Sequence, residues 1–175
     1  MTFVWIAIAA LVVCGGFAVL VLRKPDQFHY ERSRVIHAAP EAIFPLLNAP
    51  KEAEKWSPWL EMDPACQMTY SGPDSGMGVT ASWVGKKSGE GRQTIVSVLE
   101  PNEIITELEF FKPMKGVSAV VYTLTPVEGG THMSWAMSGP NSLAGKIISV
   151  FMNCEKMCGD AFEKGMENIA RLVEK

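Results

Sequence analysis

Alternation of apolar and polar residues dominates the middle of the chain and predicts a series of β-strands. In the segment 102–111, Leu108 and Phe110 alternate with Glu107 and Glu109, so one side of the strand is apolar and the other is acidic. Short turns rich in Gly, Pro, Asp and Ser separate segments of this kind, which is typical of an antiparallel meander. The pattern predicts strands over residues 28–37, 65–70, 79–84, 92–100, 102–111, 116–127 and 131–139.

Helical spacing replaces this alternation in two regions. After the first strand, Pro40 is placed to open a short helix, and residues 50–56 predict a second one. The C-terminal residues 142–174 repeat apolar side chains every three or four positions, which predicts one long amphipathic helix. Gly159 and Gly165 interrupt that helix, either to let it approach the sheet closely or to let it bend.

An uncharged segment of a different kind occupies residues 2–22. Its 21 residues match the roughly 20 apolar residues that a helix needs to cross a bilayer. A cleaved signal peptide fits less well, because no basic residue precedes the run and the run is too long. Arg23 and Lys24 follow directly, and positive charge favours the cytoplasmic side. The sequence therefore predicts a protein of the cell membrane, with a single transmembrane helix and its flank (residues 1–24) and a cytoplasmic domain (residues 25–175).

Composition and cysteine spacing argue against several kinds of partner and cofactor. The 175 residues carry a formal net charge of −3 without a long run of Lys or Arg, so we expect no nucleic-acid partner. Cys154 and Cys158 stand four residues apart, a spacing that can bind metal, but no nearby His or further Cys completes a ligand set. We therefore expect buried free thiols, no metal and no other cofactor. No strong catalytic motif stands out.

Aromatic and methionine side chains are the most informative candidates for a binding site. The ten Met residues are many for this length, and flexible thioethers suit surfaces that adapt to varied apolar ligands. The segment WSPWLEMDP, residues 56–64, carries two Trp in what its prolines predict to be a loop.

Each of these side chains either lines a pocket or fills a core, and the sequence leaves both interpretations open. Trp56, which ends the preceding helix, is interpreted as a core residue. The pocket candidates are Trp59, Trp83, Phe110, Tyr122, Met133, Trp135 and Met137.

The order of one strand, two short helices, six strands and a long C-terminal helix corresponds to the helix-grip arrangement. In WSPW at 56–59, GMG at 76–78 with Trp83 beyond it, GGTHMSW at 129–135 and GDAFEKGMENI at 159–169, the sequence resembles the START-like (SRPBCC) superfamily. It is most similar to the polyketide cyclase/dehydrase and lipid-transport branch, over about residues 28–174. The resemblance implies an α+β fold, in which a curved antiparallel sheet wraps around the C-terminal helix with a hydrophobic cavity between them.

Three functions are compatible with this resemblance, because one fold can carry several activities. The first is binding of a small hydrophobic or lipid-like molecule in the cavity, close to a membrane contacted through residues 2–22. The second is a cyclase- or dehydratase-like enzyme, for which Tyr122 is the one acid/base candidate on a plausible inner face. The third is an interaction or stress-adaptor module without a ligand, for which a solid interior is expected.

Overall fold

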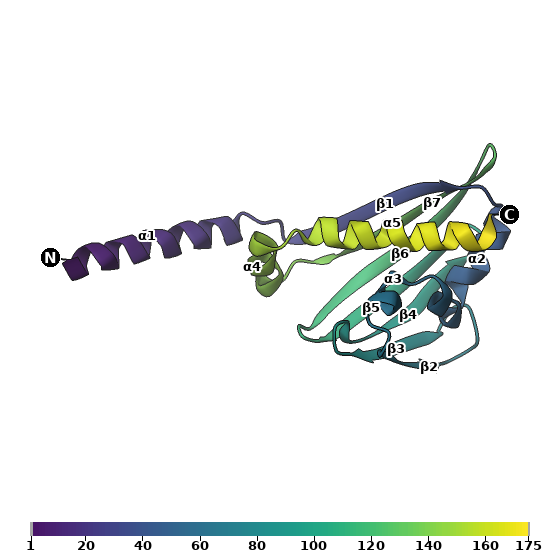
Figure 1. Cartoon of the computed structure of the whole chain (residues 1–175), viewed down its shortest axis with the longest axis horizontal. Coiled ribbons are helices and arrows are strands. Elements are labelled where there is room, and N and C mark those ends of the chain that lie inside the picture. The colour runs from purple at the N-terminus through teal and green to yellow at the C-terminus, as the bar shows by residue number, and fades with distance from the viewer. Residues whose placement is uncertain (1, 175) are drawn as a thin grey trace.

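The computed structural model describes residues 2–174, with the side chains of residues 2 and 6–10 left outside the description. One helix projects from the N-terminus, and the remaining elements build a curved sheet with α5 across one face (Figure 1). In chain order the elements are α1 (Thr2–Leu22), β1 (Gln27–Ile36), α2 (Pro40–Asn48), the 3₁₀ helix η1 (Pro50–Lys55), α3 (Pro58–Met62), β2 (Gln67–Ser71), β3 (Thr80–Gly85), β4 (Gly89–Leu99), β5 (Glu103–Lys112), β6 (Gly116–Val127), β7 (Gly130–Pro140), α4 (Leu143–Phe151) and α5 (Cys154–Val173).

The strands form a single antiparallel sheet in the order β1-β7-β6-β5-β4-β3-β2. From β2 to β7 each strand pairs with the next one along the chain, and β1 pairs with β7. Gly72 and Gly129 lie in connections and have φ angles of 89° and 82°, a backbone region that favours glycine. The meander predicted from the alternation is confirmed.

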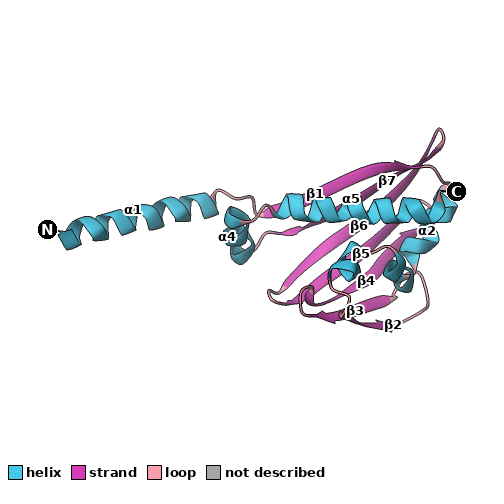
Figure 2. Cartoon of the chain, viewed as in Figure 1, coloured by secondary structure: helices cyan, strands magenta, loops and turns pink. Residues whose placement is uncertain are grey.

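Helix α5 lies along β1 and the sheet curves around it, which confirms the predicted α+β helix-grip fold (Figure 2). The core forms between the two, where Ile36 of β1, Met133 of β7 and Met166 of α5 are each 0% exposed. The side chain of Asn153 begins α5 by accepting a hydrogen bond of 3.0 Å from the Lys156 backbone N–H. The apolar face of this helix is therefore held against the inner face of the sheet.

The predicted single helix over residues 142–174 is in fact two helices. Asn153 caps α5, and α4 has a cap of its own, because Ser142 Oγ accepts a hydrogen bond of 3.2 Å from the Gly145 backbone N–H. The side chain of Phe151 on α4 is 75% exposed, so α4 does not continue the buried face of α5. The apolar spacing continues across the break, and for this reason it predicted one helix instead of two.

The segment after the second helix also differs from its prediction. Residues expected in a loop form the short helix α3, with Pro58 as its first residue. Proline is tolerated there because the first backbone N–H of a helix has no partner within that helix. Trp59 lies on α3, half-buried and packed against the core.

Helix α1 covers the range for which a membrane-spanning helix was predicted. Among the described residues, however, no helix is long and apolar enough to cross a membrane. On this finding the prediction of a single-pass protein of the cell membrane, with its domain in the cytoplasm, is wrong.

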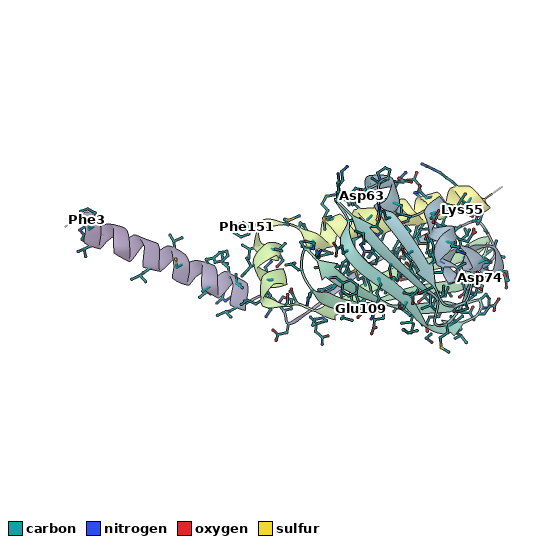
Figure 3. All side chains as sticks on the ribbon, turned by 90° about the horizontal axis from the view of Figure 1, so that it is seen from below. Phe3, Lys55, Asp63, Asp74, Glu109 and Phe151 are labelled. Carbon is teal, nitrogen blue, oxygen red and sulfur yellow. The ribbon has the colours of Figure 1, made fainter. Side chains whose placement is uncertain are left out.

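The base of α1 is held by α4. The rings of Phe17 and Phe151 lie 5.8 Å apart, and the Lys24 ammonium donates a hydrogen bond of 3.2 Å to the Ser149 carbonyl. In Figure 3 Phe151 lies beside this junction, whereas Phe3 marks the far end of α1. These contacts hold the C-terminal end of α1 against α4.

Candidate functional site

Six of the seven predicted pocket residues share the inner face of the sheet, the face that α5 covers. Tyr122 pairs directly with Trp135, and Leu124 pairs with Met133. Gly91 of β4 pairs with both Trp83 and Phe110, which places these two rings on one face. Since side chains two residues apart on a strand share a face, Met137 lies on the inner face as well. The seventh candidate, Trp59, approaches from α3 instead of from a strand.

One half of the inner face is closed by the aromatic cluster, a name we use for Trp56, Tyr122, Trp135 and Phe162. The Trp135 and Phe162 rings stack with their centroids 4.7 Å apart and an interplanar angle of 15°. Tyr122 lies 5.1 Å and Trp56 5.6 Å from Trp135, the latter edge to face. Stacked and edge-to-face contacts of this kind stabilise aromatic pairs in addition to the free energy gained by burying their apolar area. The cluster makes this half of the interior solid.

Trp56 of this cluster also forms hydrogen bonds that connect three helices. Its indole N–H donates a hydrogen bond of 2.9 Å to the Leu46 carbonyl, in the last turn of α2, where carbonyls lack helical partners. The buried Asn168 of α5 donates to the Trp56 carbonyl at 3.1 Å and to a Glu61 carboxylate oxygen at 2.7 Å. The Trp-Pro segment therefore joins α2, α3 and α5, and Trp56 is the core residue that its position predicted.

The other half of the inner face is only partly covered. We call it the open inner surface and define it by Trp83, Leu108, Phe110 and Met137, all of which are half-buried. The Trp83 and Phe110 rings meet edge to face at 5.8 Å. Gly91 makes room for them, because a Cβ at this position would collide with the Trp83 ring. Apolar rings and chains thus stay partly exposed directly beside the closed core.

Three polar side chains stand among these apolar residues. Gln93 Nε2 donates a hydrogen bond of 2.7 Å to Thr106 Oγ1. The Tyr122 hydroxyl lies near enough to the Gln93 side chain for this group to lower its pKa slightly. Burial raises the pKa of the Tyr122 hydroxyl well above its usual value, because the phenolate would lose its hydration. Tyr122 is therefore a neutral hydrogen-bonding group near pH 7 and not a general base.

The residues Gln93, Thr106 and Leu108 were not among the sequence-predicted site residues. Thr106 and Leu108 alternate in register with Phe110, so the same pattern that selected Phe110 could have selected them. Gln93 reads as an ordinary polar strand residue, and only its pairing with Leu108 across β4 and β5 places it on the inner face. Selection by aromatic and Met character therefore missed the polar part of the site.

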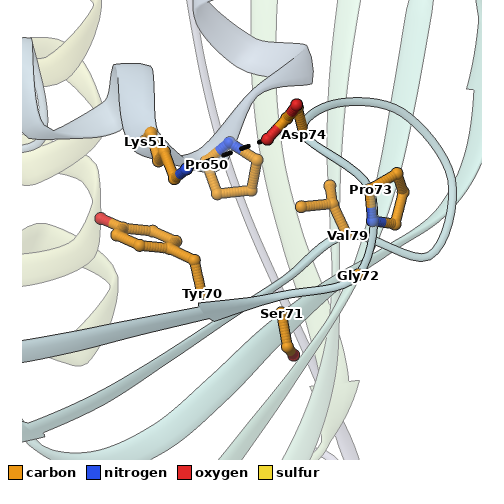
Figure 4. Close-up of a pocket in the computed structure, with 8 residues that line it drawn as sticks. All are labelled: Pro50, Lys51, Tyr70, Ser71, Gly72, Pro73, Asp74 and Val79. Atoms are coloured by element: carbon orange, nitrogen blue, oxygen red, sulfur yellow. Dashed lines mark ion pairs between the residues drawn. The ribbon is translucent and has the colours of Figure 1, made fainter.

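Two surface hollows lie elsewhere on the molecule. One, of about 70 Å³, lies between η1 and the connection after β2, where the Lys51 ammonium is 3.9 Å from an Asp74 carboxylate oxygen (Figure 4). This volume holds only a few water molecules. The other, of about 440 Å³, lies mainly among outer-face residues of β4 to β7, including Ile105, Val117 and Ala119. Neither hollow includes the open inner surface.

Of the charged side chains, Arg32 of β1 shares the inner face with Trp135, where it pairs with Glu155 and Glu163 of α5, but the acidic residues of β5 do not lie there. Glu107 and Glu109 lie on the outer face, and Glu109 pairs there with Arg92. This ion pair holds the pKa of Glu109 below its usual range. Within residues 2–174, no group of three or more His, Cys, Asp or Glu side chains is placed to hold a metal ion. The open inner surface can therefore bind by apolar contact, with neutral hydrogen-bonding groups beside it.

Comparison with known proteins gives a consistent family and fold. Residues 27–174 match the family described as polyketide cyclase/dehydrase and lipid transport. None of the curated proteins matches the sequence.

Among solved structures, protein CV1439 from Chromobacterium violaceum superimposes with a TM-score of 0.62 at 18% identity, covering 87% of this chain and 99% of that one. The Aha1 dimer from Colwellia psychrerythraea gives 0.61 at 15% identity, with 84% and 96% covered. The di-domain ARO/CYC protein StfQ from the steffimycin biosynthetic pathway gives 0.61 at 11% identity, with 85% and 51% covered. At these identities the likeness is one of fold.

Proposed function

Because this chain belongs to the polyketide cyclase/dehydrase and lipid-transport family, we propose that it binds a small hydrophobic or lipid-like molecule on its open inner surface. The observation that carries the proposal is the contrast between the two halves of one sheet face. The aromatic cluster is closed by α5, whereas Trp83, Leu108 and Phe110 remain partly exposed next to it. Covering apolar surface is favourable by about 25 cal/mol per Å², so a matching apolar ligand gains free energy there.

The mechanism of binding is burial between the sheet and the segments that border it. Trp83 and Phe110 supply flat rings, Met137 supplies a flexible thioether, and Trp59 of α3 stands at the border of the core. Met133 contributes from below the surface, since it is 0% exposed and packs the closed part. Neutral polar groups nearby orient the ligand without the cost of burying a charge.

An enzymatic function of the cyclase or dehydratase type is the second candidate, and Tyr122 is the observation that favours it. The neutral phenol of Tyr122 can donate a hydrogen bond to an oxygen of a bound substrate. In a dehydration, the proton of a substrate C–H bond passes to solvent water and a C=C double bond forms. The C–O bond breaks as the hydroxyl, hydrogen bonded by Tyr122, takes a proton from solvent and leaves as water. Loss of water from a bound molecule, detected by mass spectrometry and abolished in Tyr122→Phe, distinguishes this function from binding alone.

The test of the binding function uses two neighbouring phenylalanines on opposite faces. Phe110 belongs to the open inner surface, whereas Phe111 faces outward, is 43% exposed and lies under the Arg92 guanidinium. We expect Phe110→Ala to weaken binding of the uncharged dye N-phenyl-1-naphthylamine to the full chain, and Phe111→Ala to leave it unchanged. Dye bound to α1 contributes equally to both variants. Equal affinities of the two variants and the parent would exclude the open inner surface as the binding site.

A further inference from the structure

Four hydrogen-bonding side chains form a diagonal line across the inner face, one on each of four adjacent strands. Gln93 of β4 lies one step along the face from Ile95, which pairs with Thr106 of β5. Thr106 pairs with Val120, one step from Tyr122 of β6, and Tyr122 pairs with Trp135 of β7. Steps of two residues keep a side chain on the same face of the sheet. The apolar interior is thus crossed by a polar line that leads from the partly open half to the closed half.

Two members of this line are hydrogen bonded to each other, and the last member, Trp135, has no partner. Gln93 donates a hydrogen bond of 2.7 Å to Thr106, and its side chain lies close enough to the Tyr122 hydroxyl to influence its pKa. Trp135 is only 4% exposed. Its indole N–H is fully covered and has no hydrogen-bond partner. A buried donor without a partner is costly, and a Trp N–H that is buried usually finds one.

The missing partner of Trp135 must be an acceptor, because an indole N–H donates only. By contrast, the indole of Trp56 in the same cluster donates to the Leu46 carbonyl, so the fold can satisfy a Trp there with its own backbone. Met137 lies one step from Trp135 on the same face of β7 and is half-buried. The open inner surface, to which Met137 belongs, therefore begins next to Trp135 on the same face of the same strand.

We propose that Trp135 determines ligand specificity by donating its indole N–H to an acceptor oxygen carried by the hydrophobic ligand. The ligand class is then an apolar molecule with a carbonyl or similar acceptor oxygen, in preference to a bare hydrocarbon of the same shape. Gln93, Thr106 and Tyr122 continue the polar line and orient further oxygens of the same molecule. This inference rests on the proposed binding function and names the chemistry of the molecule that the site takes.

The experiment compares two probes of nearly equal shape, 2-acetylnaphthalene and 2-isopropenylnaphthalene, which differ in a C=O against a C=CH₂ group. Affinities are measured for the full chain by equilibrium dialysis. We expect Trp135→Phe to weaken binding of the ketone by about 3- to 10-fold, the worth of one hydrogen bond, and to leave the alkene unchanged. Trp5→Phe, the same substitution at a residue that is 70% exposed on α1, should change neither affinity.

An infrared measurement gives a readout that packing alone does not move. With the ketone labelled by ¹³C at its carbonyl, the C=O band of the bound probe should lie at lower frequency than in hexane, and should return in Trp135→Phe. A bound ketone in the parent protein whose band is unshifted overturns the inference even if the variant does not fold.

The outcomes separate this inference from the function on which it rests. Binding of both probes with equal losses in Trp135→Phe would refute the role of the N–H and leave the binding function standing. Equal losses are also expected if a buried water molecule accepts the indole N–H both with and without a bound probe, and this too would refute the role of the N–H. Failure of both probes to bind the parent would refute the binding function itself.

Discussion

Gly165 of α5 is the position where one added methyl group tests the packing of the helix on the sheet. A Cβ at Gly165 would lie 2.6 Å from Trp135 Cζ3 and 3.4 Å from Pro58 Cδ. The Trp135 ring has little room to yield, because it stacks on Phe162 at 4.7 Å and is bordered by Tyr122 at 5.1 Å. Gly165→Ala should therefore push the helix away from the aromatic cluster.

Gly159 on the same helix is the matched control. A Cβ there would meet the end of the Arg32 side chain at 2.5 Å, but this guanidinium is flexible, and its ion pairs with Glu155 and Glu163 are on the exposed side. Both substitutions gain about 1 kcal/mol of helix propensity. Overpacking at a rigid contact costs about 1–3 kcal/mol, whereas a surface side chain moves aside at little cost. We expect the free energy of unfolding to be lower in Gly165→Ala than in Gly159→Ala by about 1–3 kcal/mol.

Urea unfolding followed by circular dichroism measures both variants against the parent. In a Trp135→Phe background the shorter ring no longer reaches the position of Cζ3, so the penalty of Gly165→Ala should largely vanish. A double-mutant cycle over these two positions isolates this contact. A Gly165→Ala variant as stable as Gly159→Ala, or an unchanged penalty without the Trp ring, would show that α5 does not press on Trp135 as described.

Three further substitutions probe the hydrogen bonds around the site. Asn168→Ala should lower the free energy of unfolding by about 1–3 kcal/mol in a urea titration, because it leaves the Trp56 carbonyl without its side-chain donor; an unchanged midpoint would contradict this. Trp56→Phe should cost about 1 kcal/mol more than Trp135→Phe in the same assay, since only Trp56 donates to a backbone carbonyl; equal costs would count against the unpartnered Trp135 N–H. Backbone N–H groups of Lys87 and Ser88 donate to Asp63 and lower its pKa, so the ionised carboxylate stabilises the fold. The free energy of unfolding should therefore fall as the pH drops through and below the ordinary Asp pKa of 3.8. In Asp63→Asn this fall with pH should be less steep.

Local pattern was sufficient for the strands and for the assignment of their faces. Side chains alternate along any strand, so Met133, Trp135 and Met137 had to share one face once the strand was recognised. The same reasoning separates Phe110 from Glu109, which lies on the outer face. These features depend only on neighbouring residues, and therefore a linear sequence contains them.

Contacts between distant segments decided how much of that face is covered. Trp83 and Trp135 occur in similar alternating segments, yet Trp135 is buried against Phe162 of α5, and Trp83 stays half-buried. The break before Asn153 contributes, because it frees α4 from the sheet and aligns only the second helix with β1. Which polar groups meet was equally hidden, since Gln93 and Thr106 come together only through the pairing of β4 with β5. Alternation tells which way a side chain points, but coverage depends on what packs above it, and that is set by residues far away along the chain.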